Sequence, residues 1–365
     1  MEMTEIHGSC EPRFEPVRGA FQQAFESGAD VGASFAVTLE GKMVVDFWGG
    51  YADEAKTRPW ERDTIVNVFS TTKTMTALCA LILADRGAID LYAPVARYWP
   101  EFAQNGKEKV EVRHLLSHSA GLPTWDKPIS VETLYDWDKA TSLLAEQKPR
   151  WEPGTASGYH GITQGNLVGE VVRRVTGKSL GTFFRETIAE PIGADFHIGL
   201  DPKHFVRVGE MIPPVTDPSL TATGNPPLDA RESATAGWRQ AEIPAANGHG
   251  NARSVAMVQT LLACGGEAFG VRVMSQAGCD VVLEKQTDGI DKMLGTPMQF
   301  GMGYGLIPGR RACFWGGWGG SLAYVDLDSH VSIAYVMNKM NSTTVGDERS
   351  AIPLRAFFRC LSGKL

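Results

Sequence analysis

The strongest hydrophobic pattern in the chain is the run MTALCALILADRG, which begins at Met75. Its apolar residues occupy most of the helical circumference, so residues 71–86 are predicted to form a buried helix. Gly87 is the expected stop. Residues 14–28 are predicted to form a helix with a single apolar face. That face carries Phe14, Val17, Phe21 and Phe25.

β-rich runs lie at both ends of the chain. GASFAVTLEGKMVVDFWGG is predicted to be a hairpin turning at Glu40-Gly41, and DLDSH is the expected turn of a second hairpin near the C-terminus. Residues 347–361 are expected to form a closing helix. The simplest packing is one antiparallel sheet built from both ends and flanked by helices, an α/β part, with an all-α part inserted. We therefore expect an α/β domain of residues 1–85 and 260–365 and a mainly helical domain of residues 86–259.

The composition and charge of the chain disfavour several classes of function. The 365 residues carry a net charge of −7, with 43% hydrophobic and 21% charged residues, which is typical of a globular protein. This mild acidity disfavours nucleic acid as a partner. No run approaches the roughly 20 apolar residues that span a bilayer. The start MEMTEIHGSCEPRFEP has no signal-peptide pattern, and the six cysteines are scattered, so a cytoplasmic location is predicted.

The segment STTK places a hydroxyl and an amine one helical turn apart. Ser70 and Lys73 at i and i+3 share a helix face. A lysine in an apolar site loses affinity for its proton and becomes able to act as a base toward a serine. The pattern equally fits an ordinary serine N-cap with a solvent-exposed lysine nearby.

Two later segments supply further candidate chemistry. Tyr159 lies in WEPGTASGYHGITQGN, where its phenol could relay a proton, although a half-buried structural tyrosine fits as well. FWGGWGGS, residues 314–321, could bring free backbone N–H groups to an oxyanion, or it could be a glycine-rich turn that packs two tryptophans. The Pro- and Gly-rich segment 211–250 is expected to form a wall or lid of a site.

Several other kinds of site are disfavoured. His114 and His118 are four residues apart, but no third metal ligand is evident, so structural histidines are favoured. The G-x-S-x-G signature of α/β-hydrolases is absent. We expect neither a metal nor an organic cofactor.

Taken in order, STTK, HLLSHSAGLPTW, WEPGTASGYHGIT, GYGL and WGGWGGS resemble the serine β-lactamase-related enzymes. The closest group is the family VIII carboxylesterases, which share the fold of class C β-lactamases and penicillin-binding proteins. The resemblance runs from about residue 14 to the C-terminus and implies a β-lactamase-like fold with the site in a cleft.

The resemblance also implies roles for individual residues. Ser70 is the implied acyl-forming nucleophile, expected to cap the helix as well, with Lys73 its base or proton shuttle and Tyr159 a proton relay. The backbone N–H groups of Ser70 and Trp318 are the implied oxyanion hole. The segments that carry the resemblance also provide the expected substrate-binding residues, which are Trp315, Gly316, Gly317, Trp125 and His160.

The chain departs from the β-lactamase pattern twice. Tyr159-His160-Gly161 stands where a Tyr-x-Asn loop is usual, and Trp315 replaces the lysine of the Lys-Thr-Gly strand. Both changes point away from carboxylate-bearing β-lactams and toward small neutral esters. The expected activity is therefore a serine carboxylesterase. A β-lactamase or D-amino-acid peptidase, an acyltransferase using the same acyl-enzyme, and a non-catalytic binding module remain alternatives.

Overall fold

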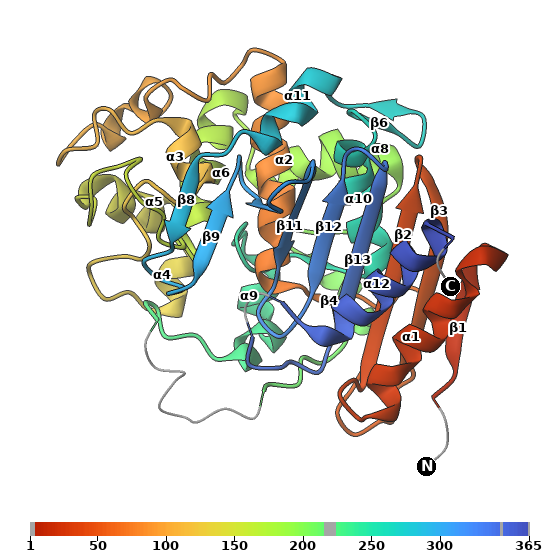
Figure 1. Cartoon of the computed structure of the whole chain (residues 1–365). Helices are drawn as coiled ribbons and strands as arrows, with labels where there is room; N and C mark the ends of the chain where they lie inside the picture. Colours follow the sequence, from red (N-terminus) through yellow and green to blue (C-terminus); the bar gives the residue numbers. More distant parts are fainter. Residues whose placement is uncertain (1–3, 215–223, 344–345, 364–365) are drawn as a thin grey trace.

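The computed structural model describes residues 4–214, 224–343 and 346–363. Within these residues, a nine-stranded sheet has the order β1-β3-β2-β13-β12-β11-β10-β9-β8, and every neighbouring pair is antiparallel (Figure 1). Its strands are β1 (Ile6–Cys10), β2 (Gly32–Leu39), β3 (Lys42–Gly50), β8 (Thr287–Ile290), β9 (Pro297–Phe300), β10 (Gly305–Leu306), β11 (Ala312–Gly316), β12 (Leu322–Asp326) and β13 (Val331–Met337). The β2–β13 pairing joins the two ends of the chain, as predicted.

The predicted hairpins form because their turn residues accept unusual backbone angles. Glu40 and Gly41 both have positive φ, +50° and +78°, as a tight turn between antiparallel strands requires. Residues 327–330 make the second predicted turn, between β12 and β13. The first hairpin places β2 in the sheet interior, where seven of its eight residues are buried.

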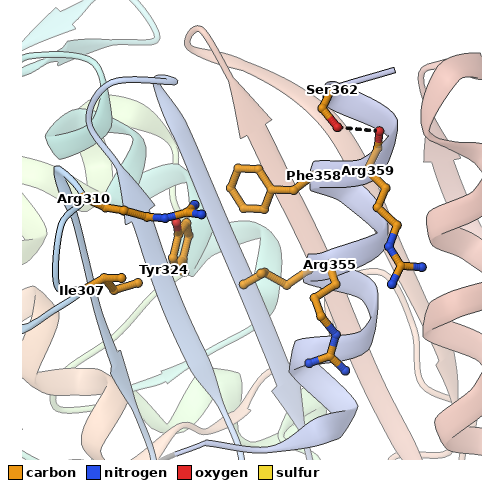
Figure 2. Close-up of a pocket in the computed structure, with 8 residues that line it drawn as sticks. Ile307, Arg310, Tyr324, Arg355, Phe358, Arg359 and Ser362 are labelled. Carbon is orange, nitrogen blue, oxygen red and sulfur yellow. Dashed lines mark hydrogen bonds between the residues drawn. The ribbon is translucent and has the colours of Figure 1, made fainter. Parts of the chain in front are cut away.

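Helices cover both faces of the sheet. The helices α1 (Glu15–Glu26) and α12 (Glu348–Leu361) pack together on the face toward the viewer in Figure 1, and α10 (Ala252–Ala263) covers β2 and β13 from behind. Between α12 and the sheet lies a groove with an apolar floor of Ile307, Tyr324 and Phe358, edged by arginines (Figure 2).

The predicted buried helix is α2 (Thr72–Asp85), whose first 12 residues are all buried. It lies between the sheet and the helical middle of the chain, where it contacts α6 and α7. This central position explains why the helix is apolar around its whole circumference.

The middle of the chain is mainly helical. Its α-helices are α3 (Val112–Leu116), α4 (Val131–Tyr135), α5 (Trp137–Glu146), α6 (Thr163–Thr176), α7 (Leu180–Phe184), α8 (Glu190–Ile192) and α9 (Ala236–Gln240). Because α10 packs on the sheet, the packing favours a domain boundary before Ala252 rather than at 260. The exact division into domains stays a proposal.

The sequence did not predict three strands of the nine-stranded sheet, β1, β8 and β9. β1 and β8 lie at the two sheet edges, where a strand pairs along one side only, and none of their residues is fully buried, so their apolar pattern is weak. β9 has only four residues, of which one is buried. Part of the expected wall or lid, residues 215–223, lies outside the described residues. No helix in the described ranges has the length and hydropathy needed to cross a bilayer.

Candidate active site

Ser70 lies in a short 3₁₀ turn, η2 (Phe69–Thr71), that leads into α2. The preceding residue, Phe69, has a φ of +44°, a left-handed conformation that costs a non-glycine residue about 1–3 kcal/mol. The expectation that Ser70 caps the helix is wrong, because Thr71 is the residue that precedes α2 and no side chain caps either helix start. The 3₁₀ turn instead directs the Ser70 hydroxyl toward Lys73 and Tyr159.

Lys73 is buried beside the serine, with only 1% of its surface exposed. Its Nζ lies 3.1 Å from Ser70 Oγ, 2.7 Å from the carbonyl oxygen of Gly161 and 2.9 Å from that of Ala245. In the described part of the chain, no carboxylate forms an ion pair with this amine. Burial without a counter-ion lowers the pKa of Lys73 well below its usual value.

Tyr159 is the second side chain in contact with the serine hydroxyl. Its phenol oxygen lies 2.7 Å from Ser70 Oγ, and its ring lies 4.8 Å from Lys73 Nζ. Burial raises the pKa of this phenol to about 12, so the group is protonated at neutral pH. A neutral phenol at this distance acts as a hydrogen-bond donor to Ser70 Oγ.

The loop that carries Tyr159 is anchored by Asp291. The Oδ1 of Asp291 accepts the backbone N–H of Tyr159 at 2.9 Å, and it also accepts those of Met293 and Leu294. Asp291 lies in the turn between β8 and β9 and is completely buried. Asp291 was not predicted from the sequence, because its only local signal is an aspartate in a turn.

His160, the next residue of the same loop, joins it to two neighbouring segments. Its Nε2 accepts the backbone N–H of Leu122 at 3.0 Å, and its Nδ1 lies 2.6 Å from the carbonyl oxygen of Gly158, which identifies the Nδ1–H tautomer. Its backbone N–H donates to His118 Nδ1 at 3.0 Å. Burial lowers the pKa of His160 to about 4. These contacts fit a structural role better than the expected contact with substrate.

The turn after β11 provides a backbone donor near the nucleophile. Gly320 N donates to Gly317 O at 3.0 Å, and Gly319 has a φ of +95°, so residues 317–320 form a type II turn. A side chain at Gly317 would begin 2.2 Å from the carbonyl oxygen of Val68, so only glycine lets the turn lie this close to η2. Across residues 4–214, 224–343 and 346–363, no protein acceptor takes the N–H of Ser70 or of Trp318.

A hydroxyl bridge fixes this turn to the start of η2. Ser321 Oγ donates to Val68 O at 2.8 Å and lies 2.9 Å from Thr71 Oγ1. The ring of Trp318 packs edge-on against Phe69, with ring centroids 5.3 Å apart. The peptides of Ser70 and Trp318 are therefore held by one set of contacts, and two free amides of this kind suit an oxyanion.

Of the remaining residues predicted to bind substrate, three lie beside Tyr159 and one lies in the helical part of the chain. Trp315, Gly316 and Gly317 are buried on β11 and in the turn beside Tyr159, and the Trp315 ring centroid lies 5.3 Å from that of Tyr159. Trp125 is buried in the helical part, where its indole N–H donates to Ala140 O at 2.9 Å. That position does not favour a substrate contact. The described residues form no cluster of three or more metal-binding side chains.

Comparisons with known proteins agree with this architecture. A family model described as Beta-lactamase matches residues 17–356. The Esterase/beta-lactamase LipL of Mycobacterium tuberculosis is 36% identical over 364 residues, which cover 93% of this chain and 84% of LipL.

Two solved structures match almost the whole chain. A family VIII carboxylesterase has 44% identity and a TM-score of 0.93, with 98% of this chain and 100% of that chain covered. A penicillin-binding protein homologue from Caulobacter crescentus has 37% identity and a TM-score of 0.91, with the same coverage. The predicted β-lactamase-like fold is confirmed, and the chain belongs to the Beta-lactamase family of serine hydrolases.

Proposed function

We propose that this protein is a serine carboxylesterase that hydrolyses small neutral esters through an acyl-enzyme on Ser70. The observation that carries the proposal is the position of Ser70 Oγ, 3.1 Å from Lys73 Nζ and 2.7 Å from the Tyr159 phenol oxygen. The esterase names of the relatives support the same reaction class. No step in this reaction requires a metal or organic cofactor.

The hydrogen-bond partners of Lys73 indicate how the serine is activated. A neutral amine has two N–H groups and one lone pair, and Nζ has two carbonyl partners, Gly161 O and Ala245 O, and one hydroxyl partner, Ser70. The two N–H groups match the carbonyls, and the lone pair then faces the Ser70 hydroxyl. Because Tyr159 is protonated and donates to the same oxygen, we assign the first proton transfer to Lys73.

The reaction then proceeds in two steps, acylation of Ser70 and hydrolysis of the acyl-enzyme. Ser70 Oγ attacks the ester carbonyl as its proton passes to Lys73, and the oxyanion accepts hydrogen bonds from the N–H groups of Ser70 and Trp318. The C–O bond to the alcohol breaks, and that alcohol takes the proton from Lys73, directly or through Tyr159. Water then attacks the acyl-enzyme, with Lys73 again acting as the base, and the carboxylic acid is released.

The residue types around the serine favour neutral substrates. Trp315 occupies β11 where β-lactamases carry a lysine, and its ring is packed against Tyr159 and Phe300, with centroids 5.3 and 5.4 Å away. A substrate carboxylate therefore gains no cation from that position. The half-buried Trp318, which packs on the buried Phe69, offers aromatic surface beside Ser70, and this suits an apolar acyl or alcohol group.

Hydrolysis of p-nitrophenyl acetate and butyrate tests the proposal. The substitutions Ser70→Ala, Lys73→Ala and Tyr159→Phe should each lower kcat by orders of magnitude, because the three groups act as a unit. Ser362→Ala, the same substitution at the end of α12, is the matched control and should keep full activity. Near-normal activity of Ser70→Ala would rule out this nucleophile.

β-Lactam hydrolysis is the second candidate, since the name of LipL includes both activities. Nitrocefin turnover at a kcat/KM comparable to that for p-nitrophenyl butyrate would favour this candidate. Turnover several orders of magnitude lower would favour the esterase, as the loss of the β11 lysine leads us to expect.

A further inference from the structure

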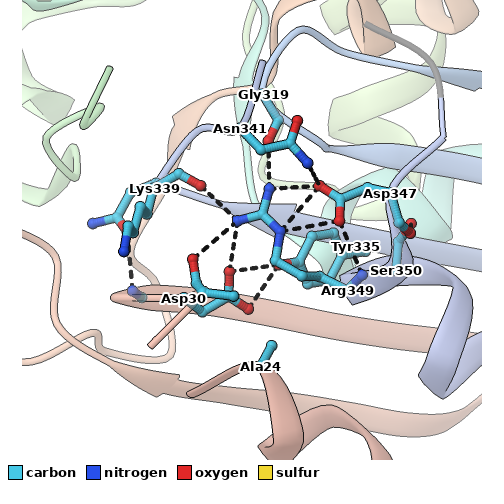
Figure 3. A network of polar contacts seen from close by, with 12 residues as sticks. Ala24, Asp30, Gly319, Tyr335, Lys339, Asn341, Asp347, Arg349 and Ser350 are labelled. Atoms are coloured by element: carbon cyan, nitrogen blue, oxygen red, sulfur yellow. Dashed lines mark hydrogen bonds and ion pairs between the residues drawn. The ribbon is translucent and has the colours of Figure 1, made fainter. Parts of the chain in front are cut away.

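A buried network of charged groups lies beside the turn that carries Trp318. Arg349, near the start of α12, contacts two buried carboxylates, Asp30 and Asp347 (Figure 3). Its Nη1 donates to Asp30 Oδ1 at 2.9 Å, and its Nη2 to Asp347 Oδ2 at 2.5 Å. Tyr335 also donates to Asp30, at 2.7 Å. Two carboxylates that hold different nitrogens fix the plane of the guanidinium.

The same guanidinium donates to the backbone of the turn. Arg349 Nη2 lies 2.6 Å from Gly319 O, and Asn341 N donates to this oxygen at 3.0 Å (Figure 3). Gly320 fits only as glycine, because a Cβ there would lie 2.2 Å from Asp347 Oδ2. The network and the turn are therefore packed in direct contact.

A continuous chain of hydrogen bonds leads from Arg349 to the Trp318 amide. Arg349 donates to the carbonyl of Gly319, which shares a peptide unit with the N–H of Gly320. That N–H donates to the carbonyl of Gly317 at 3.0 Å, which shares a peptide unit with the N–H of Trp318. Each bond in this chain fixes the orientation of the next peptide, so the guanidinium at one end orients the peptide that carries the Trp318 N–H at the other.

Stability alone is a weak explanation for these buried charges. Burying an ion pair carries a desolvation penalty that often equals or exceeds the attraction between its partners. Asp30 shows this penalty, because burial raises the pKa of its carboxyl to about 6 despite the neighbouring arginine. Fixing the Trp318 N–H of the proposed oxyanion hole gives this network a role other than stability.

We propose that Arg349 is a positioning residue for the oxyanion hole, acting through the Gly319–Gly320 and Gly317–Trp318 peptides on the Trp318 N–H. The inference rests on the proposed function, since it assigns a support to the oxyanion donor of that reaction. It predicts that loss of the guanidinium weakens transition-state stabilisation more than substrate binding.

The test compares Arg349→Lys and the charge-compensated pair Asp30→Asn with Arg349→Gln against two controls. The controls are Asp30→Asn alone and Tyr335→Phe, which disturb the network but leave the guanidinium on Gly319 O. Active sites are counted by fluorophosphonate labelling carried to completion, and thermal unfolding of every variant is recorded. Per labelled site, kcat for p-nitrophenyl butyrate should fall about tenfold or more in the Arg349 variants, with KM changed less than about threefold.

A second readout separates positioning from simple destabilisation. The inhibition constant of an alkylboronic acid, whose adduct on Ser70 places an oxygen in the oxyanion hole, should rise by a factor similar to the fall in kcat. Both controls should melt earlier yet keep kcat and boronate affinity.

The results distinguish failure of the inference from failure of the proposed function. Wild-type protein that neither hydrolyses the ester nor takes the label would refute the proposed function. If the wild type does both, and any folded Arg349 variant keeps wild-type kcat and boronate affinity, the positioning role is refuted while the esterase assignment stands.

Discussion

The position, orientation and protonation state of Lys73 are set by the residues around it. The residue spacing from Ser70 is visible in the sequence, and so is the apolar helix that buries it. Its two carbonyl partners are not visible, because Gly161 and Ala245 are 88 and 172 residues away along the chain. These carbonyls orient the amine, and burial without a carboxylate partner favours its neutral form.

The lowered pKa of Lys73 predicts a specific pH dependence of stability. The unfolded chain binds a proton at this amine below about pH 10.4, whereas the folded chain binds it only at a much lower pH. Lowering the pH through this window therefore favours unfolding. Relative to Lys73→Met, the wild-type free energy of unfolding should rise by up to about 1.4 kcal/mol per pH unit as pH increases toward 10.

Urea denaturation of the wild type and Lys73→Met at pH 7, 8, 9 and 10 measures this difference. A difference that stays constant across the series would mean that Lys73 keeps its ordinary pKa in the fold. Lys139→Met, which replaces an exposed lysine on α5, is the control and should show no such trend.

At the residue scale, the sequence indicated which side chains would lie together, but it did not indicate the residues that support them. Ser70, Lys73 and Tyr159 lie within hydrogen-bond distance, as their motifs implied. The left-handed Phe69 and the buried Asp291 were missed, since backbone strain and a long-range carboxylate contact leave almost no local signal.

Among the elements, the β8–β9 hairpin has a role beyond extending the sheet. Its turn brings Asp291 to the backbone N–H of Tyr159, 132 residues earlier in the chain. Tyr159 lies on the loop between α5 and α6, which has little regular structure, so this contact supplies rigidity that the loop lacks by itself. The hairpin therefore helps to place the phenol against Ser70.

Replacing Asp291 should separate its acceptor function from its charge. Asp291→Asn keeps an acceptor oxygen and should retain kcat within a few fold, whereas Asp291→Ala loses three backbone hydrogen bonds and should lower kcat about 10- to 100-fold. Ester hydrolysis, with kcat and KM measured separately, checks this. Equal activity of the alanine and asparagine variants would show that the contact does not position Tyr159.

For the whole molecule, the sheet brings the two ends of the chain to one site. Strands at both ends predicted this closure, and β2 pairs with β13 through seven residues. Ser70 and Trp318 meet as a consequence, although 248 residues separate them in the numbering. The short edge strands and the network around Arg349 escaped prediction, because both depend on contacts between distant segments rather than on local periodicity.

The proposed function requires that Ser70 becomes covalently acylated during turnover. Intact mass spectrometry of protein quenched in acid during hydrolysis of a slow p-nitrophenyl ester, followed by peptide mapping, tests it directly. We predict a mass increase of one acyl group on the peptide that contains Ser70, and no adduct in Ser70→Ala. An acyl group on another residue, or undiminished ester turnover by Ser70→Ala, would show that Ser70 is not the nucleophile.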